Sequence, residues 1–356
     1  MPTIPTEPIG SVPRPDALID TILKSAPATE LAALQERALS DTIQRFEATG
    51  SPVITDGEQT KSSFATYPLD GSGQIAPGGM RIDFEDGHHR QLPLLKEGPF
   101  RFATYADKFI LEARQHTDRP IKQAVISASA LSLIYPPEGI PGYSREDFIS
   151  DLVNECEKDI RRCLAAGAHK VQIDFTEGRL SLKLDPSGGV LQQFIDLINQ
   201  VCDRFAPEEQ QKLGVHVCPG GDHDSTHSAD IDYSGLLAKL FQLHVGNFYL
   251  QLASEQDRRK VLATIQQHIA PDQKVFVGVT DVIDGRIESA EEVRDRVLEA
   301  AEFIPLAQLG TTDDCGFSPF CDDRSTSRDT AFAKIKARVE GTKLAEQVLA
   351  TQAAQK

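Results

Sequence analysis

The sequence predicts an α/β protein built as a single (β/α)8 TIM barrel, and three observations lead to this prediction. Short segments rich in Val, Ile and Leu alternate about eight times with longer segments of helical periodicity. The short segments are apolar throughout, which is typical of strands buried on both faces of a parallel sheet. No Gly-x-Gly-x-x-Gly motif follows the first short segment, which disfavours the doubly wound open sheet, the main alternative.

Eight strands are expected, because each of eight short runs is largely apolar and is bounded by polar or turn-forming residues. They cover residues 8–12, 52–57, 123–128, 169–174, 213–218, 248–253, 274–279 and 304–309. Helices, recognised by apolar residues three and four positions apart, are expected over residues 145–167, 189–205, 289–303 and roughly 328–352. The first of these ends on Gly167, and the third begins with Ser289 and Glu292, which form a capping-box pattern.

Residues 60–100 depart from the strand–helix repeat and are expected to form a hairpin-like insertion. The dipeptide Asp86-Gly87 lies near its centre and is a common hairpin turn. No flexible linker divides the chain, so one barrel domain over residues 1–356 is expected.

The composition limits the partners of this chain. Of its 356 residues, 40% are hydrophobic and 25% are charged, as in ordinary globular proteins. The net charge of −16 argues against binding to nucleic acid or to an anionic membrane surface. No targeting segment or membrane span is recognisable, and six cysteines are too sparse for a disulfide scaffold. A cytoplasmic protein with small-molecule partners is expected, and a homo-oligomer is compatible with the sequence.

Polar residues follow many of the predicted strands. In a (β/α)8 barrel the carboxyl ends of the strands meet at one face, where functional residues gather. Polar residues at these ends therefore predict a site, and they are Ser11, Glu58, Asp174, His216, Cys218, Gln251 and Asp281, with Glu177 and Cys315 just beyond two of the strands.

His216 and Cys218 lie two residues apart in a predicted strand, so their side chains face the same way. Together with Cys315 they would supply the imidazole and thiolate ligands that zinc prefers, and three such ligands leave one position for exchange. The alternative is a core histidine beside two small apolar cysteines. Both interpretations remain open, because whether Cys315 lies nearby depends on how strands five and eight are arranged.

Five segments, in order, carry a family resemblance: PIGSVPRP, ITDGEQ, VQIDF, GVHVC and TTDDCGF. They resemble the motif series of the cobalamin-independent methionine synthase family, specifically its catalytic C-terminal barrel, over nearly the whole chain. That family has a (β/α)8 fold related to uroporphyrinogen decarboxylase, binds zinc and alkylates a thiol. The resemblance therefore implies zinc as cofactor, and a small thiol and an alkyl donor as partners.

The resemblance also implies roles for individual residues. His216, Cys218 and Cys315 match three zinc ligands, and Gln251 stands where the family has a glutamate ligand. Three further residues, Ser11, Glu58 and Asp174, match positions that hold the amino and carboxylate groups of homocysteine. Asp174 and Asp281 are the expected catalytic residues. The alternatives are capping roles for Ser11 and Asp174 and a solvated loop carboxylate for Glu58.

Two departures from the family pattern bear on the reaction. The segment DFTEGRL replaces the usual DEPAL, and Ile283 stands where methionine synthases have a histidine that acts as proton donor to the leaving group. The expected function is zinc-dependent transfer of a methyl or other alkyl group to a thiol, with methionine-synthase-like S-methylation of homocysteine first. Thiol addition to another electrophile such as an epoxide, and a non-catalytic zinc- or thiol-binding barrel, are the alternatives.

Overall fold

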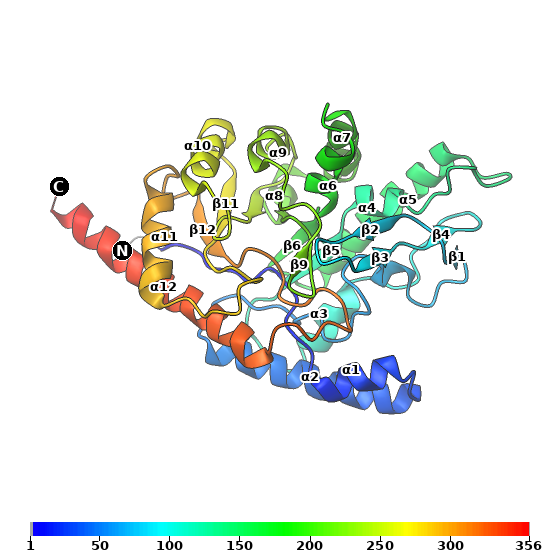
Figure 1. The fold of residues 1–356 in the computed structure, drawn as a ribbon, viewed down its shortest axis with the longest axis horizontal. Coiled ribbons are helices and arrows are strands. Elements are labelled where there is room, and N and C mark those ends of the chain that lie inside the picture. Colours follow the sequence, from blue (N-terminus) through cyan, green and yellow to red (C-terminus); the bar gives the residue numbers. More distant parts are fainter. Residues whose placement is uncertain (1–2, 356) are drawn as a thin grey trace.

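The computed structural model describes residues 3–355, and a parallel sheet of six strands lies at its centre. The strands occur in the order β12-β11-β10-β7-β6-β5, so neighbours in this sheet are consecutive along the chain and are joined by helical crossovers (Figure 1). Their bounds are β5 (Lys122–Ile126), β6 (Lys170–Asp174), β7 (Leu213–Val217), β10 (Asn247–Leu250), β11 (Lys274–Gly278) and β12 (Leu309–Thr312). The predicted α/β class with parallel strands is confirmed.

The two remaining predicted strands, residues 8–12 and 52–57, are not formed as such. Thr6 makes a single parallel bridge to Thr311 of β12, and Ile54 makes one to Ile121, beside β5. The first two segments also meet each other, since the Val12 N–H donates to the Gly57 carbonyl at 3.1 Å. Six strands of the predicted barrel are therefore confirmed within residues 3–355, and the full eight-stranded barrel is not, although both remaining segments border the sheet. Prolines explain the difference, because a residue without an N–H cannot donate to a strand ladder, and they stand at Pro5, Pro8 and Pro52.

The last strand begins later than predicted. Residues 304–309 were expected, but β12 covers Leu309–Thr312, because Pro305 opens a turn in which the Gln308 N–H donates to the Pro305 carbonyl at 2.8 Å. This shift brings the strand end close to Cys315.

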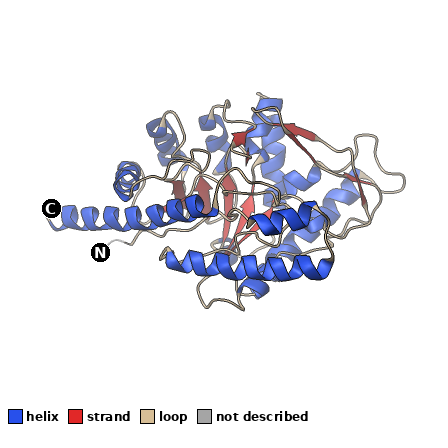
Figure 2. Cartoon of the chain, turned by 60° about the horizontal axis from the view of Figure 1, so that its bottom comes forward, coloured by secondary structure: helices blue, strands red, loops and turns tan. Residues whose placement is uncertain are grey.

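Helices surround the strands, as Figure 2 shows. The predicted helices are confirmed as α5 (Arg145–Ala165), α7 (Gly189–Cys202), α11 (Ala290–Ala301) and α12 (Arg328–Ala354). The capping box of Ser289 and Glu292 is present at the start of α11. The other helical elements are α1 (Asp16–Leu23), α2 (Ala28–Ala48), η1 (Tyr67–Leu69), α3 (Asp107–Ala113), α4 (Ala128–Ser132), α6 (Glu177–Leu184), α8 (Pro207–Gln210), α9 (Tyr233–Leu240) and α10 (Arg258–His268). None of the helices within residues 3–355 has the length and apolar character needed to cross a membrane.

The predicted insertion forms two short antiparallel pairs. β1 (Ile75–Ala76) pairs with β4 (Leu94–Leu95), and β2 (Arg81–Asp83) pairs with β3 (His89–Gln91) around the predicted turn, where Gly87 has a φ of +91°. The turn is tied to a second ribbon, β8 (Gly221–Asp222) and β9 (Ser225–Thr226), because the Glu85 N–H donates to the Thr226 carbonyl at 3.0 Å. Since this ribbon follows β7, the insertion lies at the carboxyl end of the sheet.

Candidate active site

A cavity of about 320 Å³ lies at the carboxyl ends of the strands. Five of the predicted site residues line it together, namely Ser11, Glu58, Asp174, His216 and Cys315. The parallel register places Asp174 of β6 directly beside His216 of β7. The outer wall is largely apolar and includes side chains from the insertion and the last loop, among them Phe64, Ile82, Phe84 and Phe320, together with Leu133 at the end of α4.

His216, Cys218 and Cys315 form a group that could hold a metal ion. Their ligand atoms all lie within 4.8 Å of one another, and all three side chains are buried. The two sulfur atoms are 2.9 Å apart. The proximity of Cys315, which the sequence left open, follows from the arrangement of β7 and β12 in one sheet.

The orientation of His216 fits a metal ligand. Its Nδ1 lies 3.1 Å from the Tyr249 carbonyl oxygen, to which an Nδ1–H donates. The other ring nitrogen, Nε2, is buried and has no hydrogen-bond partner among residues 3–355. A hydrogen bond from one ring nitrogen to a carbonyl fixes the tautomer and leaves the lone pair of the other nitrogen available to a metal. A histidine serving only to pack the core would be expected to have both nitrogens satisfied.

The electrostatics of the group favour negative charge on the Cys218 sulfur alone, because the hydrogen bond to Cys218 and burial raise the pKa of the Cys315 thiol well above its ordinary value. The pKa of the Cys218 thiol lies well below its ordinary value because the Cys315 thiol donates a hydrogen bond to it, while burial opposes this and His216 adds to it. Burial would lower the pKa of His216, but the Cys218 thiolate outweighs this and raises it. Two thiols and an imidazole with an unpaired nitrogen are the donors that zinc prefers, and thiolate is the form that binds a metal.

Gln251 lies outside this cavity and lines a separate one, together with Asp281 and Ile283. Its Nε2 donates to Glu255 Oε1 at 2.9 Å, and the same oxygen lies 2.7 Å from the Arg179 guanidinium. The backbone N–H of Gln251 donates to the Val217 carbonyl at 3.4 Å, which places Gln251 alongside the end of β7 and Cys218.

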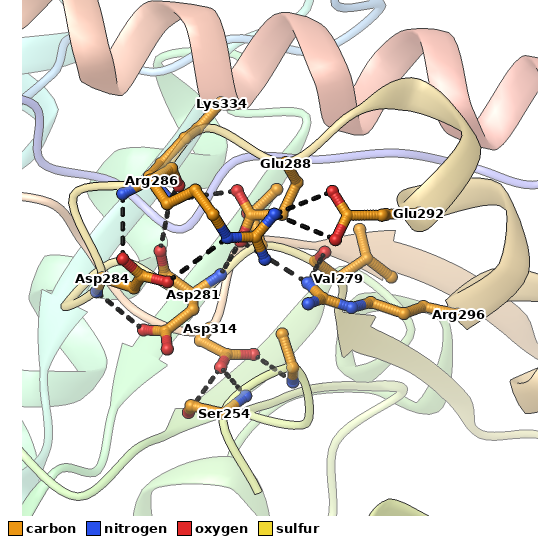
Figure 3. A network of polar contacts seen from close by, with 12 residues as sticks. Ser254, Val279, Asp281, Asp284, Arg286, Glu288, Glu292, Arg296, Asp314 and Lys334 are labelled. Atoms are coloured by element: carbon orange, nitrogen blue, oxygen red, sulfur yellow. Dashed lines mark hydrogen bonds and ion pairs between the residues drawn. The ribbon is translucent and has the colours of Figure 1, made fainter.

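Asp281 closes a turn after β11. Its Oδ1 accepts the N–H groups of Ile283 and Asp284 at 2.9 and 3.3 Å, and its own N–H donates to Glu288 (Figure 3). Of the two predicted catalytic residues, the structure therefore brings Asp174 to the main cavity and leaves Asp281 in the neighbouring one.

The three predicted substrate-binding residues are all buried. Glu58 is 2% exposed and pairs with Lys61 at 3.1 Å, so it is not a solvated loop carboxylate. The pKa of Asp174 is raised to about 6, first by burial and further by the Glu58 charge, while His216 acts in the opposite direction. The Ser11 hydroxyl accepts the Ser318 N–H at 3.2 Å, so it caps a turn as well as lining the cavity.

Arg14 and Asp314 lie inside the segments that carry the family resemblance, and both position parts of the site. The sequence did not predict this role for either residue. The buried Arg14 guanidinium donates to the carbonyls of Glu58 and Lys61 at 2.6 and 2.9 Å, and also to those of Ser318 and Phe320. It thus ties the Glu58 loop to the segment after Cys315. The signal that could have found Arg14 is an arginine in an otherwise apolar, proline-rich motif.

Asp314, the second of these residues, holds the loop that follows β10 in place. Its carboxylate accepts the N–H groups of Leu252, Ala253 and Ser254 at 2.8–2.9 Å and the Ser254 hydroxyl at 2.7 Å (Figure 3). The residue before Cys315 therefore fixes the loop that begins at Gln251.

Comparison with known proteins agrees with this geometry. The family model described as cobalamin-independent synthase, catalytic domain, matches residues 4–343. The methionine synthase of Saccharolobus solfataricus is 26% identical over 359 residues, covering 98% of this chain and 97% of that protein. The methionine synthase of Sulfurisphaera tokodaii is 22% identical over 354 residues, covering 98% and 94%.

Two solved structures share the fold. A B12-independent methionine synthase from a Shewanella species, in complex with selenomethionine, superposes with a TM-score of 0.76 at 20% identity, covering 98% of this chain and 99% of that one. A putative B12-independent methionine synthase from Listeria monocytogenes gives 0.68 at 22% identity, covering 96% and 98%. The family model spans nearly the whole chain and includes every residue that lines the cavity, so the chain belongs to the cobalamin-independent methionine synthase family, in its catalytic domain.

Proposed function

We propose that this protein is a zinc-dependent transferase that moves a methyl group to the sulfur of homocysteine. The observation that carries the proposal is the buried group of His216, Cys218 and Cys315, with its unpaired imidazole nitrogen, beside a cavity that holds Glu58 and Asp174. The relatives that match this chain over almost their full length are methionine synthases, which supports the same activity. Residues 1–356 would form one catalytic domain, in which the segments at Thr6 and Ile54 complete an eight-membered barrel.

Zinc, when bound, would lower the pKa of a coordinated substrate thiol so that it is a thiolate at neutral pH. His216, Cys218 and Cys315 would hold the ion, and Gln251 is the proposed fourth ligand through its amide oxygen. The hydrogen bond from Gln251 Nε2 to Glu255 supports this role, because it fixes the amide and leaves the oxygen as the group for the metal.

The cavity carboxylates would recognise the amino-acid part of the substrate. Glu58 and Asp174 would bind the ammonium group, and the Ser11 hydroxyl would bind the carboxylate. Lys61, also buried, holds Glu58 in place and donates to the Ala124 carbonyl at 2.9 Å. Asp174 would therefore act by positioning the thiol for attack. The catalytic role of Asp281 stays a prediction.

The zinc content of the purified protein tests the metal site. We expect about one zinc per chain by elemental mass spectrometry, and little zinc in the Cys218→Ser variant. Cys202→Ser is the matched control, because Cys202 is buried in α7, outside the metal-ligating group. A parent protein that binds no zinc even after reconstitution would contradict the proposal.

Substrate recognition is tested with Glu58→Gln in the zinc-loaded protein, using iodomethane as the methyl donor. The KM for homocysteine should rise by about tenfold or more, because one charge-assisted hydrogen bond to the ammonium is lost. With 1-propanethiol, which has no ammonium group, parent and variant should react alike. Equal effects on both thiols would show that Glu58 does not bind the amino group.

The apolar outer wall favours a second candidate, thiol addition to a small apolar electrophile such as an epoxide. Phe64, Phe84 and Phe320 line the cavity, and they offer contact area but no charge for a polyanionic donor. A higher kcat/KM with 1,2-epoxypropane than with every methyl donor tried would favour this candidate.

A further inference from the structure

Glu177 is a buried acid in the wall of the same cavity. It begins α6, three residues after Asp174 at the end of β6, and is 5% exposed. One of its carboxyl oxygens, Oε1, lies 2.6 Å from the Ser127 hydroxyl and 2.5 Å from the Ser129 hydroxyl. It belongs to the segment that departs from the family motif, so the resemblance assigns it no role.

The two carboxyl oxygens of Glu177 have different surroundings. Both serine hydroxyls donate to Oε1, and the Ser127 oxygen also accepts the Ala130 N–H at 3.0 Å, which leaves its proton for Glu177. The second oxygen, Oε2, is buried and has no hydrogen-bond partner within the described part of the chain. Because Oε1 is occupied as an acceptor, the proton of the neutral acid belongs on Oε2.

The surroundings of Glu177 keep this proton available near neutral pH. Burial raises the pKa of Glu177 to about 7, the two serine hydroxyls lower it, and the Asp174 charge raises it. The other charged or titratable groups that line the cavity are Glu58, Arg90, His216, His227, Cys315, Cys321 and Asp322. Of these, Arg90 is paired with Asp222 and Asp322. An acid with a pKa near the working pH is suited to proton transfer.

Three other residues in or near the cavity, Ile283, His227 and Asp174, are less suited to donating this proton. Ile283 occupies the position of the family's histidine and carries no proton to give. Burial lowers the pKa of His227 to about 4, so its imidazole is neutral at pH 7. A Cβ at Gly220 would lie 1.7 Å from His227 Nε2, so that ring is packed against the backbone. Asp174 is already assigned to the substrate ammonium.

We propose that Glu177 is a further catalytic residue, which contacts the alkyl donor and gives the Oε2 proton to the nitrogen or oxygen atom that leaves the transferred carbon. In this step the sulfur–carbon bond forms and the carbon–heteroatom bond breaks with its electron pair on the heteroatom. That atom takes the proton, and the Glu177 carboxylate is held by Ser127 and Ser129 until water reprotonates it. The inference rests on the proposed alkyl transfer.

Two donors separate proton donation from other roles. With homocysteine and the zinc-loaded protein, iodomethane releases iodide, which needs no proton, whereas 1,2-epoxypropane opens to an oxygen that must be protonated. Glu177→Gln should lower the epoxide rate by about 100-fold and the iodomethane rate by far less, because iodide leaves without a proton. The glutamine keeps the volume and can still accept from both serines, so the fold is preserved.

A second variant moves the pH profile. Ser129→Ala removes one of the hydrogen bonds that lower the pKa of Glu177, so the alkaline fall of the epoxide rate should shift to higher pH. Loss of rate with both donors in Glu177→Gln would make Glu177 a positioning residue, and an unchanged epoxide rate would remove it from the reaction. Either result overturns the inference while leaving alkyl transfer intact.

Infrared spectroscopy gives a readout without turnover. The difference spectrum between parent and Glu177→Gln should contain a carboxylic acid carbonyl band that disappears around pH 7. A Glu177 that is ionised already at about pH 5 overturns the inference. If the zinc-loaded parent alkylates homocysteine with neither donor, the proposed function itself fails, and the absence of activity in the parent distinguishes that case.

Discussion

The amide of Gln251 lies beside the end of β7, where its N–H meets the Val217 carbonyl and its side chain donates to Glu255. A neutral amide here has two effects. It is a weaker metal ligand than a carboxylate, and it avoids placing two carboxylates at hydrogen-bond distance in a buried setting. In the proposed zinc site, Gln251 would therefore lower the affinity for zinc and raise the stability of the protein without metal.

Gln251→Glu is expected to separate these effects. Zinc affinity should rise by about tenfold, measured by competition with a chromophoric chelator, because a charged oxygen replaces a neutral one. The Tm of the metal-free variant should fall, because the new carboxylate faces Glu255. Glu255→Gln combined with this change is the control and should restore the Tm. A variant with unchanged zinc affinity would show that residue 251 is not a ligand.

The residues of the proposed metal site differ in how well the sequence could place them. His216 and Cys218 could be placed on one face from strand periodicity alone. Cys315 could not, because its position depends on where β12 ends and on the loop that Asp314 fixes. The cavity position of Glu58 followed from the family resemblance, but its ion pair with Lys61, three residues further along the chain, depends on the turn formed there and was not predicted.

At the level of elements, the end of β11 packs closely against the segment that carries Cys315. A Cβ at Gly278 would lie 1.9 Å from Asp314 Oδ1 and 3.0 Å from its Cα, so only glycine fits there. Gly278→Ala should lower the free energy of unfolding by about 2 kcal/mol and also weaken zinc binding, because it displaces Asp314 and the adjacent Cys315. Urea denaturation and zinc titration measure the two effects.

The matched control for this change is Gly285→Ala. A Cβ at Gly285 meets no atom within 4 Å, so this variant should keep its stability and its zinc affinity. A Gly278→Ala protein as stable as the control would contradict the steric argument.

Helix α5 holds the segment that returns from the insertion, and one of its acids should make stability depend on pH. Asp159 accepts the Ala106 N–H at 2.7 Å and the Tyr67 hydroxyl, and burial raises its pKa to about 6. Because the folded state binds this proton more tightly than the unfolded chain, the contribution to stability is full below about pH 4 and is lost as the pH rises to about 6.

Asp159→Asn fixes this side chain in a neutral form. The free energy of unfolding of the parent minus that of the variant should therefore fall by about 2 kcal/mol between about pH 4 and about pH 6. Urea denaturation at several pH values measures the difference. A difference that does not change with pH would contradict the raised pKa.

The elements that the sequence predicted well are those with local signals. Helices α5 and α11 have regular apolar spacing and capping residues, and both were found. The first two strands have apolar patterns too, but their prolines limit them to single bridges, which periodicity does not reveal. The late start of β12 has the same cause, because Pro305 opens a turn within an apolar run.

For the whole molecule, a metal in the proposed site would join the end of β7 to the segment after β12, which is separated from β7 in the sheet by β10 and β11. Zinc removal by a chelator should therefore lower the Tm. If free zinc had been a thousandfold above its Kd, the free energy of unfolding should fall by about 4 kcal/mol. Differential scanning calorimetry measures the change. The Tm of Cys218→Ser should not respond to the chelator, and an equal response in both proteins would place the stabilising metal elsewhere.

The pairing of Thr6 with Thr311 has a consequence for the order of folding. The segment that carries Ser11 is synthesised first, but its partners come last: Thr311 in β12, Ser318 after it, and Glu346 of α12, which accepts the Ile4 N–H at 2.6 Å. Such distant contacts are slow to form and depend on a nearly complete chain. A nascent chain of which β5 to β11 have emerged from the ribosome therefore contains most of the sheet but not the assembled cavity.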